Sequence, residues 1–266
     1  MKSKILRLIR TKPFQPLWEK MFHYSKIGMN LYGGAAFSQS GEIEVLKYSF
    51  EKIQNKEKFI LFDVGACLGE YAEFVCNAFS ESVFVYSFEP SKLNFKKLSN
   101  AVKKKEHEGK LFPVNVGFGD KDEDIDLNIT EIGEAKHSIY DMKMVNKSFI
   151  NTFKEKITLT TIDKFCIEKN IQKIDYLKLD IEGHELFALK GASQMIVQKK
   201  IKHIQFEFSE CNIASRTYFK DFYDLLSPNY NLYRIVSNGI VPISAYSTDL
   251  EIFHITNYLA ELKSPE

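Results

Sequence analysis

The sequence has few cysteines and no excess of charge of either sign. Its four cysteines stand apart, without a CxxC pair or a cluster of histidines, so neither a zinc site nor a disulfide framework is indicated. The 36 lysines and arginines balance 35 acidic residues, which argues against a nucleic-acid partner. No apolar run approaches the ~18 residues that span a bilayer. With no apolar core of a secretory signal at its start, the protein is expected to act in the cytoplasm.

The chain starts with the basic and partly apolar segment MKSKILRLIRTKPFQ. A basic amphipathic helix can bind an anionic surface, here the inner face of the membrane. A short helix that packs its apolar side on the domain is the commoner arrangement, and it is favoured here. We assign residues 1–50 to an N-terminal helical extension and residues 51–266 to one α/β domain. Both a monomer and a homo-oligomer are compatible with this sequence.

Short β-branched and aromatic runs alternate with helix-compatible segments from Phe59 onward, which is typical of βα units and a parallel sheet. With 44% hydrophobic residues the chain can bury a core. The seven predicted strands are Phe59–Val64, Ser82–Phe88, Leu111–Val116, Tyr176–Asp180, Ile204–Phe208, Leu232–Val236 and Glu251–Ile255. Helices are predicted over Gly69–Phe79, Lys92–Lys105, Thr161–Lys169 and Ser215–Leu226.

The segment Ser237–Asp249 between the last two predicted strands contains Gly239 and Pro242 but no helical periodicity. A parallel crossover usually needs a helix, so these two strands are predicted to pair antiparallel. The fold class is therefore α/β, with helices on both faces of a seven-stranded, mostly parallel sheet whose last strand is reversed. This is the Rossmann-like fold of class I methyltransferases.

The segment FILFDVGACLGEYAEF places Asp63, Gly65 and Gly69 at a turn from a strand into a helix. Glycines there permit close backbone approach, and free N–H groups at the helix start favour an anionic ligand group. Neither GxGxxG nor GxxxxGK[ST] is present. Glu89 ends the second predicted strand, where a carboxylate can accept hydrogen bonds from ribose hydroxyls of NAD or of S-adenosylmethionine. A nucleoside-containing cofactor is indicated.

Four segments together resemble the FkbM family of S-adenosylmethionine-dependent O-methyltransferases: DVGACLGEY, FEPS, TIDKFCIEKNIQKIDYLKLDIEGHELFALKGA and HIQFEFSE. The resemblance runs from about Phe37 to the end of the chain, and IDYLKLDIEGHE is its most specific part. Cys67 departs from the asparagine that is common in the family at this position, so Cys67 is not expected to be a functional residue.

The resemblance implies that S-adenosylmethionine is the cofactor and that three segments hold it. The turn from Asp63 to Tyr71 would hold the methionine part, Glu89 and Pro90 the ribose, and Gly117 to Asp120 would border the adenine. The implied cofactor-binding residues are Asp63, Gly65, Ala66, Gly69, Tyr71, Glu89, Pro90, Gly117 and Asp120. The implied acceptor is a hydroxyl of a sugar from a bacterial surface polysaccharide, methylated as a nucleotide-activated hexose or heptose destined for capsule or lipopolysaccharide.

A sugar hydroxyl stays protonated at neutral pH, so its methylation gains from a general base or from a metal ion. Asp180 ends the fourth predicted strand and Glu207 lies near the end of the fifth, and both are expected beside the cofactor. Asp180 is the first candidate for the base, with Glu207 as its partner, or the two bind Mg²⁺ or Mn²⁺. His184 and His137 are further catalytic candidates.

Three other readings stay open at this point. The acceptor could be a hydroxyl of a small natural product such as a polyketide. The same kind of sheet could carry an NAD(P)-dependent oxidoreductase, although GxGxxG is missing. A ligand-binding module without catalysis is the third reading. Glu182 and Glu185 fit the start of a helix, where its dipole stabilises carboxylates.

Overall fold

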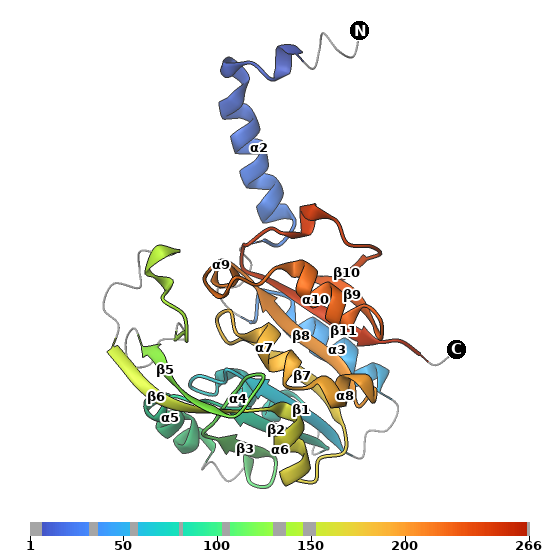
Figure 1. The fold of residues 1–266 in the computed structure, drawn as a ribbon. Coiled ribbons are helices and arrows are strands. Elements are labelled where there is room, and N and C mark those ends of the chain that lie inside the picture. Colours follow the sequence, from blue (N-terminus) through green and yellow to red (C-terminus); the bar gives the residue numbers. More distant parts are fainter. Residues whose placement is uncertain are drawn as a thin grey trace.

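The computed structural model describes residues 7–31, 37–53, 58–79, 82–102, 107–129, 137–145 and 153–264. An eight-stranded sheet forms the middle layer, helices cover both of its faces, and a three-stranded sheet lies against one end (Figure 1). The predicted residues 103–105 at the end of one helix lie outside the described part. The α/β Rossmann-like architecture predicted from the sequence is confirmed.

The large sheet has the order β10-β9-β11-β8-β7-β1-β2-β3. Its strands are β1 (Phe59–Val64), β2 (Val83–Phe88), β3 (Leu111–Val114), β7 (Ile174–Leu179), β8 (Ile201–Phe208), β9 (Tyr230–Val236), β10 (Gly239–Ile243) and β11 (Thr256–Leu262). Strands β3, β2, β1, β7 and β8 are parallel, and β11 is antiparallel to both β8 and β9. The predicted reversal of the final strand is therefore correct.

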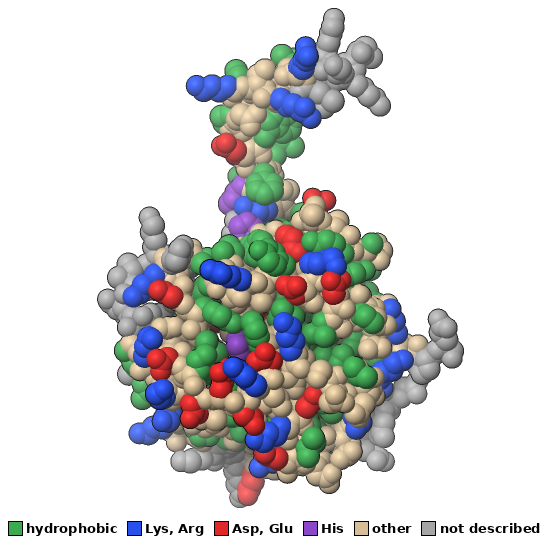
Figure 2. Space-filling model, viewed as in Figure 1, with side chains coloured by type: hydrophobic (Ala, Val, Ile, Leu, Met, Phe, Trp, Pro, Cys, Tyr) green, Lys and Arg blue, Asp and Glu red, His purple; other side chains and the backbone are tan. Residues whose placement is uncertain are grey.

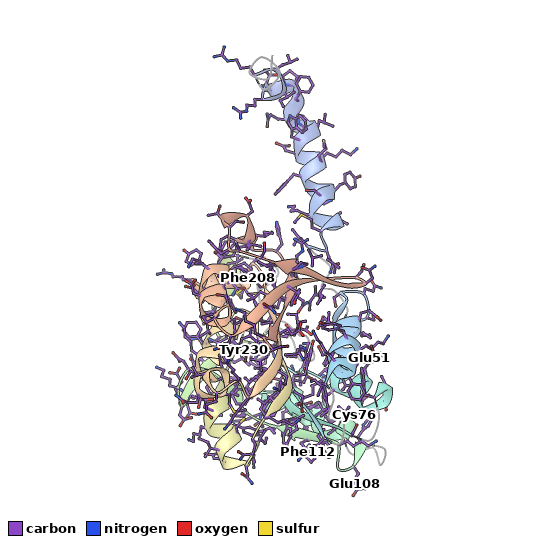
Figure 3. All side chains as sticks on the ribbon, turned by 90° about the vertical axis from the view of Figure 1, so that its right-hand side faces the viewer. Glu51, Cys76, Glu108, Phe112, Phe208 and Tyr230 are labelled. Carbon is purple, nitrogen blue, oxygen red and sulfur yellow. The ribbon has the colours of Figure 1, made fainter. Side chains whose placement is uncertain are left out.

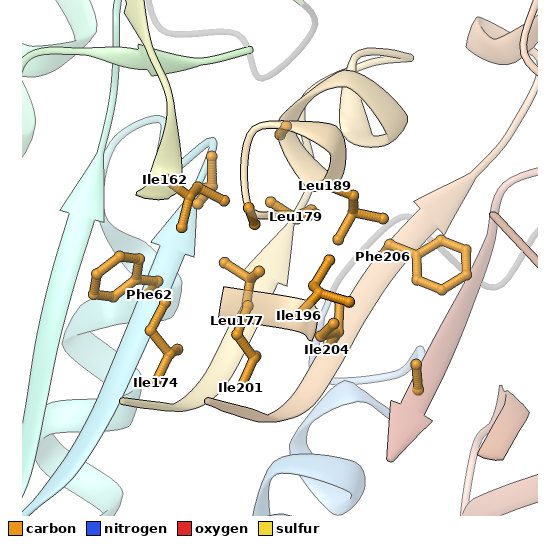
Figure 4. Packing of buried hydrophobic residues seen from close by; sticks show 14 of the residues in the cluster. Phe62, Ile162, Ile174, Leu177, Leu179, Leu189, Ile196, Ile201, Ile204 and Phe206 are labelled. Atoms are coloured by element: carbon orange, nitrogen blue, oxygen red, sulfur yellow. The ribbon is translucent and has the colours of Figure 1, made fainter. Parts of the chain in front are cut away.

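Strand side chains alternate between the two faces of the sheet, and each face has its own core. Phe62, Leu177 and Ile204 belong to the larger core, whose packing Figure 4 shows. Phe59 and Leu61 point to the opposite core. The helices are α3 (Glu42–Lys52), α4 (Glu70–Ala78), α5 (Lys92–Val102), α6 (Ile162–Glu168), α7 (Glu185–Lys190), α8 (Ser193–Val197), α9 (Cys211–Ser215) and α10 (Phe219–Leu226).

The sheet has one strand more than the seven predicted, because part of the predicted loop 237–249 forms β10. Gly239 pairs with Val236 across a tight turn, and Pro242 is tolerated because β10 is an edge strand. The last strand was predicted at Glu251–Ile255 but runs over Thr256–Leu262, since Thr256 is the first residue to pair with β8.

A second sheet with the order β4-β6-β5 was not predicted. Its strands are β4 (Gly117–Phe118), β5 (Glu123–Ile129) and β6 (Phe153–Thr160). The sequence between the third and fourth predicted strands looks polar because one face of this sheet meets solvent. The other face buries Leu127, Ile129, Ile157 and Leu159.

The packing predicted for residues 1–15 is described only from residue 7 onward, and none of residues 7–15 is buried. Helix α2 (Gln15–Gly28) projects away from the sheet in two perpendicular views (Figures 1 and 3), and none of its residues is buried. Residues 1–6 of the basic start lie outside the described part. Helix α3 differs from α2, because its Val45 and Leu46 join the core beneath β1.

Candidate active site

A pocket that is partly open to solvent lies at the carboxyl ends of β1, β2 and β7, and the second sheet forms one of the walls of this cavity. Its polar lining comes from the strand ends and the following loops. The apolar wall comes from β5, β6 and their neighbours. The lining residues are Val64, Gly65, Cys67, Phe88, Glu89, Pro90, Asn94, Val116, Gly117, Phe118, Leu127, His137, Ile139, Ile157, Leu159, Asp180, Ile181, Glu182 and His184.

The turn after β1 packs directly against the end of β7. Gly65 has φ +89°, and a Cβ placed on it would lie 1.9 Å from the carbonyl oxygen of Asp180. The N–H groups of Gly65 and Ala66 both donate to the carbonyl of Phe88 at 3.0 Å. Glycine is therefore required here because the ends of β1, β2 and β7 approach each other closely, whether or not a ligand also contacts this turn.

Glu89 is a buried carboxylate at the end of β2, with 5% of its surface exposed. Its Oε2 accepts a hydrogen bond from the N–H of Cys67, and its Oε1 accepts one from the N–H of Ser91, both at 2.9 Å. Burial raises the pKa of Glu89 to about 8 despite these bonds. Ligand hydroxyl groups in the cavity could donate to its remaining lone pairs and stabilise the ionised form.

Asp180 follows β7, and its Oδ2 lies 2.9 Å from the ammonium of Lys178. Lys178 also lies 4.0 Å from the carboxylate of Glu42. Asp63 on β1 is fully buried, and neither of its carboxylate oxygens has a hydrogen-bond partner. Burial raises the pKa of Asp63 to about 6, while the charge of Lys178 opposes this rise. Lys178 is thus the cation of a buried acidic cluster.

The loop between β7 and α7 is held in a strained conformation. Glu182 has φ +52° and Gly183 has φ +98°. The Oε1 of Glu185 accepts hydrogen bonds from the N–H groups of Ile181 at 2.8 Å and Gly183 at 3.2 Å. Burial raises the pKa of Glu185 to about 8. Glu185 therefore closes the loop, while the side chain of Glu182 accepts a hydrogen bond from the Cys211 thiol at 2.9 Å.

His184 lines the cavity and has one unpaired ring nitrogen. Its Nδ1 lies 2.8 Å from the hydroxyl of Tyr140, and its ring stacks on Phe187 with centroids 4.8 Å apart. The Nε2 atom is buried and has no hydrogen-bond partner. Burial lowers the pKa of His184 to about 4, so the imidazole is neutral at pH 7. His137 also lines the cavity, with its Nδ1 3.3 Å from the amide of Asn94.

The predicted site residues divide into two groups. Those that line the cavity are Gly65, Glu89, Pro90, Gly117, Asp180, His184 and His137. Those that do not are Asp63, Ala66, Gly69, Tyr71, Asp120 and Glu207. Asp63 and Tyr71 are buried beside Lys178, and Asp120 is exposed at the surface. The pKa of Glu207 is raised by burial and by the nearby charges of Asp180 and Glu182.

Sequence reasoning missed Asn94, Lys178 and the second sheet, and it discounted Cys67. Asn94 is 1% exposed and its Oδ1 has no hydrogen-bond partner, although it lies on a helix that looks ordinary in sequence. The backbone of Cys67 matters more than its side chain, because its N–H binds Glu89. Lys178 within the apolar run IDYLKLD was the available signal, since a buried lysine requires acidic partners.

The predicted metal role of Asp180 and Glu207 has no support in the arrangement of ligands. Among the described residues, no three His, Cys, Asp or Glu side chains converge on a point where they could hold an ion. The carboxylate of Asp180 instead binds Lys178. In the same part of the chain, no helix is long and apolar enough to cross a membrane.

The reversed strand β11 and the glycine turn beside a buried strand-end carboxylate are features of the Rossmann-like methyltransferase fold. The chain belongs to the family of the methyltransferase FkbM domain, whose model matches residues 63–235. It is 25% identical over 159 residues to the hexuronic acid methyltransferase AglP of Haloferax volcanii, a match covering 59% of this chain and 58% of that protein. The chain thus spans less than two thirds of this relative.

A solved structure of an FkbM methyltransferase shares the fold. The FkbM methyltransferase of Methylobacillus flagellatus has a TM-score of 0.50 at 16% identity, over 88% of this chain and 57% of that chain. An O-methyltransferase of Bacillus cereus, solved in complex with SAH, has a TM-score of 0.46 at 10% identity, over 98% of this chain and 96% of that chain.

Proposed function

We propose that the protein transfers a methyl group from S-adenosylmethionine to a hydroxyl group of a sugar. The observation that carries this proposal is the cavity in which the buried carboxylate of Glu89 at the end of β2 and the carboxylate of Asp180 at the end of β7 lie on either side of β1 in an FkbM domain. The relative AglP is named for methylation of a hexuronic acid, which supports a sugar acceptor.

The residues of the cavity fit the proposed cofactor. Glu89 would accept hydrogen bonds from two ribose hydroxyls, Pro90 and Gly117 would lie beside the nucleoside, and the apolar residues of β5 and β6 would cover the adenine. Gly65 and its turn would hold the methionine part, with Asp63, Ala66, Gly69 and Tyr71 supporting this turn from behind. Asp120 would lie at the border of the adenine site. When bound, S-adenosylmethionine supplies an electrophilic methyl group.

Asp180 is the proposed acceptor of the proton from the sugar hydroxyl. Its carboxylate is partly exposed to the cavity, and the bond to Lys178 holds it in one orientation. The neutral His184, with Nε2 unpaired, and His137 are positioned as the next candidates to bind or deprotonate the acceptor. Glu207 is proposed to act on Asp180 as a neighbouring buried carboxyl group, whose pKa the charge of Asp180 helps to raise.

The proposed substrate is a nucleotide-activated hexose or heptose, methylated in the cytoplasm before it is built into capsule or lipopolysaccharide. A small natural product such as a polyketide is the second candidate acceptor. The FkbM match favours methyl transfer over hydride transfer, so the NAD(P)-dependent oxidoreductase is the weakest reading. A role for Mg²⁺ or Mn²⁺ at Asp180 and Glu207 is tested by adding a chelator to the activity assay.

Two measurements test this function. Calorimetric titration with S-adenosylhomocysteine and with NAD should give heat of binding for the first ligand alone. The protein is then incubated with S-adenosylmethionine and a panel of nucleotide-activated hexoses, heptoses and hexuronic acids, with and without chelator. Mass spectrometry should find a sugar that is heavier by one methylene. Binding of NAD in place of S-adenosylhomocysteine would overturn the proposed methyl transfer. Methylation of finished polysaccharide alone would overturn the proposal that the substrate is a nucleotide-activated sugar.

A further inference from the structure

Helix α2 exposes a continuous apolar surface that no described part of the domain covers. Leu17, Met21 and Phe22 are 50%, 53% and 62% exposed, and Tyr24 is 60% exposed. These four residues and Trp18 fall within one sector of a helix with 3.6 residues per turn. Isolated exposed apolar side chains are ordinary, but a helix that presents a row of them to solvent needs a binding partner.

The charge of the extension identifies the chemistry of this partner. Between residues 7 and 28 the extension has five basic residues and one acidic residue: Arg7, Arg10, Lys12, Lys20, Lys26 and Glu19. Basic side chains are grouped at the outer part of the extension in Figure 2. The whole chain has a formal net charge of only +1, so this excess is a local property. An apolar helix face flanked by lysine and arginine is complementary to anionic phospholipids.

The inner end of α2 is attached to the edge of the sheet that carries the cavity. The side-chain amide of Asn30 donates to the carbonyl of Ile235 at 3.2 Å, near the carboxyl end of β9. The Lys26 ammonium lies 3.2 Å from Nε2 of His254, in the segment that enters β11. Because β11 is antiparallel, its start lies at the same sheet edge as the ends of β7 and β8. A surface that binds α2 would therefore lie on the side of the active-site edge.

We propose that α2 is a peripheral anchor that inserts its apolar face into an anionic phospholipid surface. A helix of 14 residues is about 21 Å long, shorter than the ~30 Å core of a bilayer, so it would lie along the surface and not cross it. Pairing of α2 with a second copy is less favourable, because a two-fold interface would bring the same basic residues of both chains together. The anchor stands on this helix alone and does not depend on the proposed methyl transfer.

Vesicle co-sedimentation tests the anchor. The full chain should sediment with vesicles of phosphatidylglycerol and phosphatidylcholine in equal parts, but not with phosphatidylcholine alone. The triple variant Leu17→Ser, Met21→Ser, Phe22→Ser should lose at least about tenfold in affinity, because each side chain contributes buried apolar area. High salt should weaken the binding of the parent protein by screening the basic residues.

The matched control is the double variant Ile167→Ser, Val197→Ser. It removes two apolar side chains that are 80% and 67% exposed on the domain, and it should sediment like the parent protein. The proposal is overturned if the parent protein ignores anionic vesicles, or if the triple variant and the control bind equally. It is also overturned if light scattering shows a parent dimer that the triple variant converts to a monomer, because α2 would then pair with its own copy.

Discussion

The ammonium of Lys178 forms a 2.9 Å ion pair with Asp180, although the lysine side chain is 6% exposed and the aspartate side chain is 38% exposed. The pair therefore links the buried cluster of Asp63 and Glu42 to the cavity. Nearby carboxylates raise the pKa of Lys178 in spite of its burial, so this lysine stays charged at neutral pH. A fixed cation at this position orients Asp180.

Asp180→Asn should lower methyl turnover by about 10²-fold or more, because the amide cannot accept the proton of the acceptor hydroxyl. The affinity for S-adenosylhomocysteine should stay nearly unchanged in calorimetry. Asp249→Asn, at an exposed position, is the control and should turn over like the parent protein. If Asp180→Asn remains fully active with and without chelator, the base must be sought at His184 or His137.

Lys178→Met should destabilise the fold by about 2–4 kcal/mol, since it removes the cation from between buried carboxylates. The charge of Lys178 lowers the pKa of Asp63, so this pKa should rise above about 6 in the variant. Urea denaturation at several pH values measures both effects. If the variant and the parent protein have the same urea denaturation midpoint at pH 8, Lys178 does not hold the acidic cluster together.

Glu89 should make the stability of the fold depend on pH. Its pKa is raised from 4.5 to about 8, so the folded protein holds a proton that the unfolded chain has lost between these two pH values. Stability therefore falls as pH rises through this window, and Glu89→Gln should remove about 1–3 kcal/mol of that fall. Chemical denaturation of both proteins at pH 5 and pH 9 gives the difference.

The same carboxylate must ionise to accept hydrogen bonds from ribose. Binding of S-adenosylhomocysteine should release a proton below pH 8, which calorimetry detects in buffers of different ionisation enthalpy. Glu89→Ala should weaken binding by about 1.5–3 kcal/mol, the scale of hydrogen bonds to a charged group. Equal affinity and equal proton release in a folded Glu89→Ala protein would remove Glu89 from the ribose site.

Gly65→Ala should be strongly destabilising, because the added Cβ would meet the Asp180 carbonyl oxygen at 1.9 Å. Gly109→Ala is a matched control: its φ is also positive, at +76°, but nothing lies within 4 Å of the added Cβ. The control should lose only the conformational cost of about 1 kcal/mol. Thermal melts of the two variants separate the effect of steric contact from that of backbone strain. Equal melting temperatures would show that the contact with the Asp180 carbonyl oxygen does not destabilise the fold.

His184 should remain neutral well below the usual range of histidine. Burial lowers its pKa from 6.5 to about 4, so the unfolded chain takes up a proton between these values and the folded protein does not. Stability should therefore decrease as pH falls from 6.5 toward 4, and His184→Gln should lessen this decrease. NMR titration of the imidazole follows the same event directly. Protonation near pH 6.5 would show that His184 is open to solvent.

The sequence predicted best where a local pattern carries the structure. The run FILFDV and the turn at Gly65 gave β1 and its loop correctly, and Glu89 was placed at the end of β2. The alternation of polar and apolar residues in β5 and β6 was a strand signal that the sequence analysis did not use, and the pairing of these two strands, which are distant in the sequence, could not be read from it. Asn94 is buried beside Cys67 and His137, which are also distant from it in the sequence. Such pairing has no local signature.

Lys178 illustrates a different limit of sequence analysis. A lysine in an apolar strand indicates a buried ion pair, but only the register of β7 beside β1 identifies the partners. Asp63 pairs with Lys178 across these two strands, whereas sequence reasoning assigned Asp63 to the cofactor. The roles of carboxylates at neighbouring strand ends therefore depend on which face of the sheet each side chain takes.

The position of β11 between β8 and β9 has a consequence for folding order. Residues 230–243 cannot join the sheet until residues 256–262 have been synthesised and inserted, since β9 has no direct pairing with β8. During translation, the hairpin of β9 and β10 must wait as a separate unit while β8 has an open edge. A chain that stops before Thr256 would expose that edge to other molecules, so premature termination late in synthesis should lead to aggregation.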